Sequence, residues 1–165
     1  MQETANQYIK RILSYNEKGD PVKSLERNAQ RLDRIMRKAK RSNFRKSRGK
    51  GTWTFAHILS HLAEGELVSA YRMRAIVNAN GCDIQAYDQN QWVQNAAYLR
   101  KNPKSAYELF RTVRNSNFAF LKSLSKKQWN YYGMHSERGK ETIQRLASMM
   151  AGHDVNHLSQ LEEIA

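Results

Sequence analysis

Residues 140–164 read KETIQRLASMMAGHDVNHLSQLEEI, and this stretch decides the fold class. Its apolar residues recur mostly at spacings of three and four, which is the period of a helix that buries one face. We therefore predict a helix over roughly residues 140–164, preceded by Gly139. The residues on its buried side are Ile143, Leu146, Ala147, Met150, Leu158, Leu161 and Ile164.

The same periodicity recurs in three further long segments of the chain. Asp20-Pro21 and Asn102-Pro103 each predict a helix start, because proline at the first helical position loses no needed hydrogen bond. Thr52 is a candidate N-cap, and Asn80-Gly81 predicts a helix end, because both residues tolerate the left-handed conformation. We predict long helices over residues 21–39, 52–78 and 103–124, and shorter ones over residues 4–16, 90–99 and 125–129.

Four long helices predict an all-α fold, a four-helix bundle with the helix over residues 4–16 as a short extra element. No apolar–polar alternation of the kind that strands show persists over a useful length. A chain of 165 residues can bury roughly 70% of the surface that its unfolded form exposes, so folding needs no disulfide or metal. We expect a single domain over residues 1–165.

The cysteine count and the N-terminal residues favour an intracellular location. Cys82 is the one cysteine, which excludes an internal disulfide framework and fits a reducing compartment. The N-terminal residues have neither the basic nor the apolar region of a secretory signal. No run approaches about 18 consecutive apolar residues, so we expect no membrane insertion and a cytoplasmic location.

The chain is strongly basic, with a formal net charge of +13. Seven basic residues and no acidic ones lie in Lys38–Lys50, between the first two long predicted helices. Two interpretations stay open: a solvated charged loop, or a surface that binds nucleic acid or an acidic protein. Phe44 is the only aromatic residue there, fewer than proteins that bind single strands use for stacking.

Four of the five histidines form two His-x-x-x-His pairs, His57/His61 and His153/His157. Residues four apart on a helix share a face, with Cβ atoms about 5–6 Å apart, so two imidazoles can converge on one ion. A third ligand must then come from another helix. Histidine also serves in helices as a half-buried hydrogen-bonding residue, but His153 and His157 lie at the border of an apolar stripe. His135 falls in the loop before the last helix, where it either caps the loop, as we expect, or approaches the site.

Polar residues near these histidines are candidates for supporting roles. Asp154 is in phase with the apolar residues of its helix, and a buried carboxylate is costly unless it is paired. It either fixes the tautomer of a ligating histidine or bonds to a polar group of another helix. Glu64 and Gly65 share the helix face of His61, where a glycine leaves space for a ligand or a close helix contact. Gln160 lies on the face of the 153/157 pair.

Two blocks of the sequence resemble the DinB/YfiT-like family. Residues 53–66, WTFAHILSHLAEGE, resemble a helix that starts near Trp-Ser and continues into His-Leu-Ala-x-x-Glu. Residues 152–162, GHDVNHLSQLE, resemble the C-terminal pattern His-Asp-x-x-His-x-x-Gln, which is the more specific block. The likeness extends over nearly the whole chain, through Tyr71–Arg74, Asp88, Trp92, residues 111–117 and residues 135–142.

The resemblance implies an up-down-down-up four-helix bundle, often a homodimer. It implies a metal site of three histidines, which are His61, His153 and His157 in this sequence. It also implies metal-dependent transfer or isomerisation with low-molecular-weight thiols such as bacillithiol or mycothiol. His57 stands where the family more often has a carboxylate or amide, so we do not expect it to bind the metal.

Three neutral imidazoles leave at least one coordination position open, as in catalytic zinc sites. An open position can take a water or a thiol, whose pKa the ion lowers. Imidazole ligands favour zinc or nickel over magnesium or calcium. We expect a metal-dependent thiol transferase or hydrolase that acts on a small molecule, with Asp154 and Glu64 in orientation or proton transfer. The alternative is a non-catalytic basic helical module that binds nucleic acid or an acidic protein.

Overall fold

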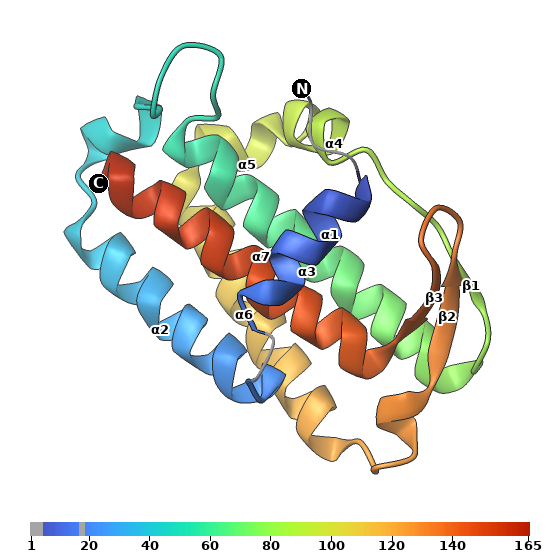
Figure 1. Cartoon of the computed structure of the whole chain (residues 1–165). Coiled ribbons are helices and arrows are strands. Elements are labelled where there is room, and N and C mark those ends of the chain that lie inside the picture. The colour runs from blue at the N-terminus through green and yellow to red at the C-terminus, as the bar shows by residue number, and fades with distance from the viewer. Residues whose placement is uncertain (1–4, 17–18) are drawn as a thin grey trace.

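Four long helices form the body of the molecule in the computed structural model, which describes residues 5–16 and 19–165 (Figure 1). They are α2 (Pro21–Lys38), α3 (Phe55–Asn78), α6 (Pro103–Ser123) and α7 (Ile143–Ile164). Helices α2 and α7 run in one direction, and α3 and α6 run in the other (Figure 1). The order along the chain is therefore up-down-down-up, and the predicted all-α four-helix bundle is confirmed. Residues 1–4 and 17–18 of the expected domain lie outside the described residues.

Shorter elements connect and cover the bundle. Helix α1 (Ala5–Ser14) packs against α7, and a small three-stranded sheet lies where α3 ends and α7 begins (Figure 1). The others are the 3-10 helix η1 (Arg41–Arg45), α4 (Gln89–Asn95), α5 (Ala97–Lys101), the 3-10 helix η2 (Gln128–Asn130), and the strands β1 (Asp83–Ile84), β2 (Tyr132–His135) and β3 (Gly139–Thr142). Among the described helices, none is both long enough and apolar enough to cross a membrane.

Side-chain caps explain where the long helices begin. The Asp20 carboxylate accepts hydrogen bonds from two backbone amides at the start of α2, as predicted. The N-cap predicted at Thr52 is wrong, and α3 begins three residues later. The reason is that the hydroxyl of Thr54 accepts from a first-turn amide of α3 at 3.3 Å. The hydroxyl of Thr52 instead donates to the carbonyl of Gly49 in the preceding turn.

The predicted start of the last helix, near residue 140, is also wrong. Residues 139–142 form β3, and α7 begins at Ile143 after Thr142, whose hydroxyl accepts from Arg145 N at 3.1 Å. Strand β2 pairs antiparallel with β3 and parallel with β1. Strands of two to four residues are too short to show an alternating pattern, so the sheet could not be predicted.

The shorter predicted helices are present with altered bounds. The segment predicted as one helix over residues 90–99 contains two, α4 and α5, and Asp88 caps the first of them. The turn predicted over residues 125–129 is η2. The helix predicted over residues 4–16 is α1, and Thr4 lies outside the described residues.

The buried apolar residues form two clusters at different levels of the bundle. On α7, one cluster takes residues 143–151 and the other takes residues 158–164. On α3, the clusters likewise occupy the two ends of the helix, with a gap between residues 63 and 73. Buried polar side chains fill the level between the clusters. They include Glu66, Arg72, Arg114, Asn117, Asp154 and His157.

Helix α1 lies directly on α7 at Gly152. A Cβ added to Gly152 would lie 1.9 Å from the carbonyl oxygen of Ile12, far closer than nonbonded atoms approach. A glycine at this position therefore allows the two helices to touch. The contact buries Ile9 and Ile12 and closes one side of the polar level.

Candidate metal centre

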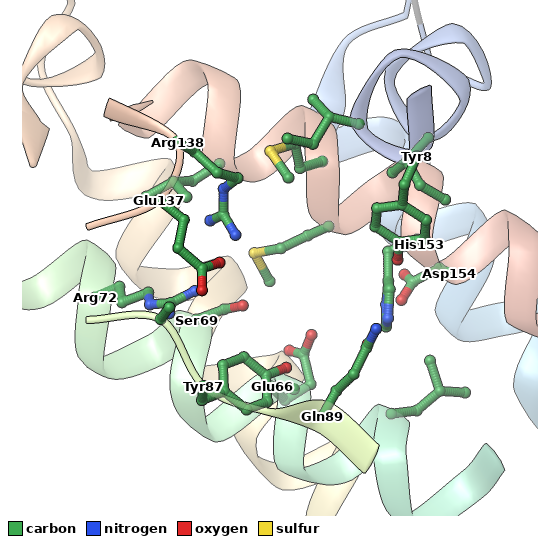
Figure 2. Close-up of a pocket in the computed structure, with 18 residues that line it drawn as sticks. Tyr8, Glu66, Ser69, Arg72, Tyr87, Gln89, Glu137, Arg138, His153 and Asp154 are labelled. Atoms are coloured by element: carbon green, nitrogen blue, oxygen red, sulfur yellow. The ribbon is translucent and has the colours of Figure 1, made fainter. Parts of the chain in front are cut away.

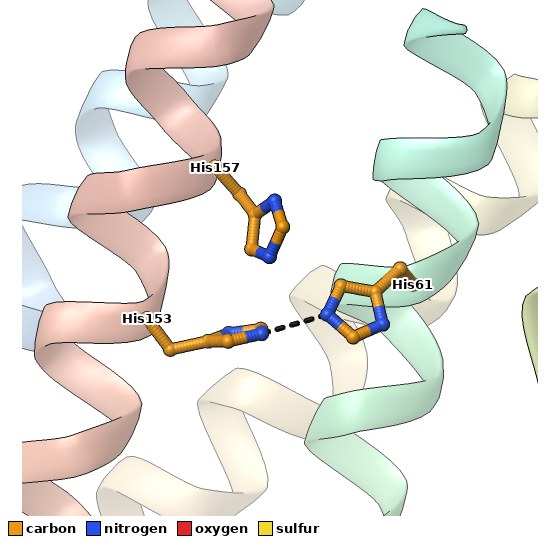
Figure 3. A group of neighbouring side chains, drawn as sticks. All are labelled: His61, His153 and His157. Carbon is orange, nitrogen blue, oxygen red and sulfur yellow. Dashed lines mark hydrogen bonds between the residues drawn. The ribbon is translucent and has the colours of Figure 1, made fainter. Parts of the chain in front are cut away.

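Three histidines from two helices meet inside the bundle (Figure 3). His61 comes from α3, and His153 and His157 come from successive turns of α7. Their ring centroids form a nearly equilateral triangle, with separations of 4.8, 4.7 and 4.5 Å. One nitrogen from each ring lies within 4.8 Å of the other two. The fold therefore brings together the three histidines that the family resemblance implies.

The spacing of the nitrogens suits a divalent transition metal. Nε2 of His61 lies 2.7 Å from Nε2 of His153, a distance at which one nitrogen donates a proton to the other. Two nitrogen ligands of a tetrahedral zinc ion lie about 3.4 Å apart, given zinc–nitrogen distances of about 2.0–2.1 Å. A small outward movement of the two rings would therefore let an ion take the place of the shared proton.

Gln160 sets the protonation state of His157. Its Oε1 lies 3.0 Å from Nδ1 of His157. A carboxamide oxygen can only accept, so Nδ1 holds the proton and donates it to Gln160. The lone pair of the ring is then on Nε2, the nitrogen left for a metal.

Burial keeps the three imidazoles uncharged at neutral pH. Loss of water lowers the pKa of His61 well below its ordinary value, and the two neighbouring histidines lower it further. Burial and the nearby Arg114 lower the pKa of His153 to about 4. Burial and then His153 lower the pKa of His157, although the hydrogen bond to Gln160 opposes this. Neutral imidazole is the form that binds metal ions, so the rings are ready at neutral pH.

Trp53 covers the histidines on one side. Its ring centroid lies 4.9 Å from that of His61 and 6.0 Å from that of His157, with an interplanar angle of 15° to the second ring. An indole in this place restricts the ring orientations and excludes water from two of the three imidazoles. In the sequence, Trp53 stands out only as part of the family pattern, which assigns it no role.

Asp154 points into the bundle, as predicted, and pairs there with Arg114 of α6. Two guanidinium nitrogens of Arg114 donate to its two carboxylate oxygens at 2.8 and 3.1 Å. The other side of the same guanidinium donates to both oxygens of Glu66 at 2.7 and 2.9 Å. Of the two roles left open for Asp154, the contacts are those of a carboxylate bonded to a polar group of another helix.

This buried triad was missed at the level of sequence, although a signal was present. Arg114 follows Phe110 by four residues and precedes Leu121 by seven, so it lies in phase with the apolar stripe of α6. Burial lowers the pKa of Arg114, but the coulombic and hydrogen-bonding effects of Asp154 and Glu66 outweigh it and raise the pKa overall. The guanidinium therefore stays charged and fixes α3 and α7 next to the histidines.

The remaining candidate residues lie outside the histidine cluster. Glu64 is buried on α3 and accepts a hydrogen bond from the Tyr98 hydroxyl at 2.8 Å. His57 contacts the capping residue Thr54, with Nδ1 and Oγ1 2.6 Å apart. The loop predicted at His135 is wrong, because the residue ends β2; its Nδ1 accepts from Glu137 N at 3.1 Å, which is a turn-capping contact of the expected kind.

A cavity of ≈390 Å³ opens beside His153 (Figure 2). Helix α1 and residues of α3, α7, the segment after β1 and the β2–β3 turn line it. Gly65 is part of the wall, where an added Cβ would meet His153 Cε1 at 3.9 Å. This is ordinary van der Waals contact, so the glycine lies at the wall of the cavity next to the histidine and not in a forced close contact between helices.

The basic segment Lys38–Lys50 covers the C-terminal end of α7. Asn43 is buried and donates to the carbonyl oxygens of Ile164 and Ala165 at 2.9 and 3.0 Å. Arg48 pairs with Glu163 at 3.3 Å. Part of the segment thus stabilises a helix end, and its other cationic side chains are largely exposed.

Comparison with known sequences shows to which family the chain belongs. A sequence model of the DinB superfamily matches residues 24–161. A protein of Bacillus subtilis (strain 168) named "Putative metal-dependent hydrolase YfiT" is 21% identical over 117 residues, 70% of this chain and 65% of the relative. This match therefore spans slightly less than two thirds of that relative's length. A protein of Oceanobacillus iheyensis named "Putative metal-dependent hydrolase OB0413" is 20% identical over 162 residues, 97% of this chain and 84% of the relative.

Comparison with solved structures shows the same fold. The structure of YfiT from Bacillus subtilis, a four-helix bundle of unusual topology, matches with a TM-score of 0.80 at 18% identity. The match covers 99% of this chain and 88% of that one. A mycothiol-dependent maleylpyruvate isomerase matches with a TM-score of 0.71 at 14% identity, over 86% of this chain and 59% of that one.

Proposed function

This chain belongs to the DinB superfamily, and from that premise we propose that it is a metal-dependent enzyme acting on a small molecule. His61, His153 and His157 are the proposed ligands of one divalent transition metal. The observation that carries the proposal is the convergence of three neutral imidazoles beside a cavity. Two relatives support it, because both carry the name "Putative metal-dependent hydrolase".

The donor set favours zinc or nickel as the metal. Three imidazole nitrogens are borderline-soft ligands, whereas magnesium and calcium require oxygen ligands. No carboxylate belongs to the cluster found among the described residues. Three protein ligands also leave a coordination position open, which is the property of catalytic rather than structural zinc sites.

The reaction that we propose is hydrolysis or the transfer of a low-molecular-weight thiol. An ion at this site would lower the pKa of a water or thiol that it binds. The mycothiol-dependent isomerase among the structural neighbours supports the transfer of a thiol. Gln160 orients one ligand, and Trp53 keeps solvent from two of them.

We further propose supporting roles for the two carboxylates. Asp154 acts through Arg114, which holds the helices that bear the ligands, and so it is a positioning residue. Glu64 lies on the helix face of His61 and accepts a hydrogen bond from the Tyr98 hydroxyl, a contact through which it would exchange a proton with a ligand. Burial and Glu64 raise the pKa of Tyr98, so the proton stays on the phenol at neutral pH.

The function is tested by linking metal content to reaction rate in protein purified without an affinity tag. We expect about one equivalent of zinc or nickel per chain, because a site with three histidine ligands binds such ions tightly. Zinc-loaded protein should accelerate either the hydrolysis of a chromogenic ester or its thiolysis by cysteine. EDTA should abolish the acceleration, and added zinc should restore it. Protein that holds no stoichiometric metal, or rates that EDTA leaves unchanged, would overturn the proposal.

Replacing Gln160 with leucine should weaken zinc binding by about 10–100-fold, because the hydrogen bond that orients His157 is lost. The dissociation constant can be measured by competition with a chromophoric chelator. Gln144→Leu, an exposed position on the same helix, is the matched control and should bind zinc like the wild type. Equal affinities for the two variants would show that Gln160 does not support the ligand.

A further inference from the structure

We propose that the cavity beside His153 binds a small acid, whose anionic group is held by the buried guanidinium of Arg72. The inference rests on the proposed function, because it names the substrate class of the same site. Arg72 and His153 lie on opposite sides of the cavity (Figure 2). A ligand that fills the space would therefore have its charged end at Arg72 and its reacting end near the histidines.

Arg72 is buried without a carboxylate partner. Its side chain is on α3, and the residue is only 8% exposed. Among residues 5–16 and 19–165, no aspartate or glutamate forms an ion pair with it. Arg114, the other buried arginine of this level, has two carboxylates on its guanidinium. A buried charge without a partner is costly, so the difference between Arg72 and Arg114 indicates that Arg72 is placed to bind an anion.

The guanidinium of Arg72 has donors left for a ligand. Its Nη2 donates to the carbonyl of Gln85 and lies 3.4 Å from Nε2 of His135. The ring of Tyr87 lies against it, with 5.4 Å from the guanidinium carbon to the ring centroid. These contacts hold the group in place and engage only part of its five N–H donors. A planar fork with free donors is the geometry that recognises a carboxylate.

Two hydroxyl groups face the same space. Ser69 is one turn before Arg72 on α3, and Tyr87 follows β1 (Figure 2). Neither hydroxyl has a hydrogen-bond partner in the described part of the chain. The serine hydroxyl can donate to a ligand oxygen. The tyrosine hydroxyl can do so as well, because burial raises the pKa of Tyr87 and keeps the proton on the phenol. The wall around Arg72 therefore offers several donors for one anion.

Arg138 is the second cation at this end of the cavity, and the carboxylates that act on Arg72 are Glu141 and Glu137. Arg138 shares one oxygen of Glu141 with Arg145, at 3.1 and 3.4 Å. Glu66 and Asp154 are engaged by Arg114. Glu137 is the remaining carboxylate of the wall; it lies exposed in the β2–β3 turn, where it competes with a bound anion for the two arginines.

The size of the space limits the ligand. A cavity of ≈390 Å³ is near the lower end of the range for small-molecule sites, about 300–1,000 Å³. A molecule of a few carbon atoms with a carboxylate at one end fits, whereas a nucleotide with its sugar and several phosphates would fill or exceed the volume. The substrate class is therefore a short-chain acid.

The test is calorimetric titration of the full chain with succinate, and with the neutral diamide succinamide as the uncharged match. Wild-type protein should bind succinate and not succinamide, both zinc-loaded and after EDTA treatment. Arg72→Gln should weaken succinate binding roughly 10–100-fold, because hydrogen bonds to a charged group are lost. Glu137→Gln should tighten it roughly two- to five-fold, because a competing carboxylate is removed. Lys140→Gln, an exposed position on β3, is the control for the loss of one positive charge and should bind like the wild type.

The variants separate this inference from the proposed metal function. A gain of affinity in Glu137→Gln cannot result from misfolding, and thermal melting of Arg72→Gln checks its fold. Succinate binding that depends on Arg72 in protein without zinc affinity would support the anion site and refute the metal centre. Equal binding of succinate and succinamide, unchanged binding by Arg72→Gln, or no binding by the wild type would overturn the anion site.

Discussion

Replacing His61 with alanine should abolish stoichiometric zinc binding while His57→Ala leaves it intact. Of the three proposed ligands, found among the described residues, His61 alone does not come from α7, and two ligands on one helix face cannot enclose an ion. The affinity should fall by at least about 100-fold, since even the loss of a residue that orients a ligand weakens binding by about 10–100-fold. Zinc content after gel filtration and competition with a chelator measure the effect.

His57→Ala is a matched control, because it makes the same replacement of histidine by alanine on the same helix. His57 is partly buried on α3, one turn before His61, and its ring contacts Thr54 instead of the cluster. Zinc should also raise the unfolding free energy of the wild type, by about 4 kcal/mol at a free concentration 1,000-fold above the dissociation constant. His61→Ala should lose this stabilisation. If both alanine variants retained stoichiometric zinc, the three-histidine site would be refuted.

Replacing Arg114 with alanine should lower the unfolding free energy by about 3–5 kcal/mol. Glu66 and Asp154 would remain buried, at 4% side-chain exposure each, without the cation that they share. An uncompensated buried carboxylate must either stay charged in a poor solvent or take up a proton, and both outcomes destabilise the folded state. Urea unfolding followed by circular dichroism measures the change, provided that the slope of the transition is unaltered.

An exposed ion pair gives the matched control for Arg114. Arg31 of α2 pairs with Glu162 of α7 at 2.6 Å, with side chains 26% and 46% exposed. Water screens this pair, so Arg31→Ala should lower the unfolding free energy by no more than about 1 kcal/mol. A loss for Arg114→Ala as small as that for Arg31→Ala would mean that the buried triad does not hold the helices together.

The helices could be predicted because their determinants are local. The stripe from Ile143 to Ile164 and the cap at Asp20 act within one or two turns of the chain. The bounds were wrong where two candidates competed, as with Thr52 and Thr54, because only the folded turn decides which hydroxyl reaches a free amide. The strands escaped prediction because pairing with a neighbouring strand, and not a pattern of their own, defines segments of two to four residues.

The sequence by itself determined four amphipathic helices, the shared face of His153 and His157, and the inward direction of Asp154. These follow from the 3.6-residue period, which places neighbours three and four apart on one side of a helix. Only the tertiary structure decided the partners across helices. Arg114 reaches Glu66 and Asp154 over 48 and 40 residues, and Arg72 lies in a buried wall without such a partner. The absence of a partner for Arg72 holds for residues 5–16 and 19–165. Contacts of this kind depend on how the helices pack, and packing is set by all the apolar faces together rather than by any one segment.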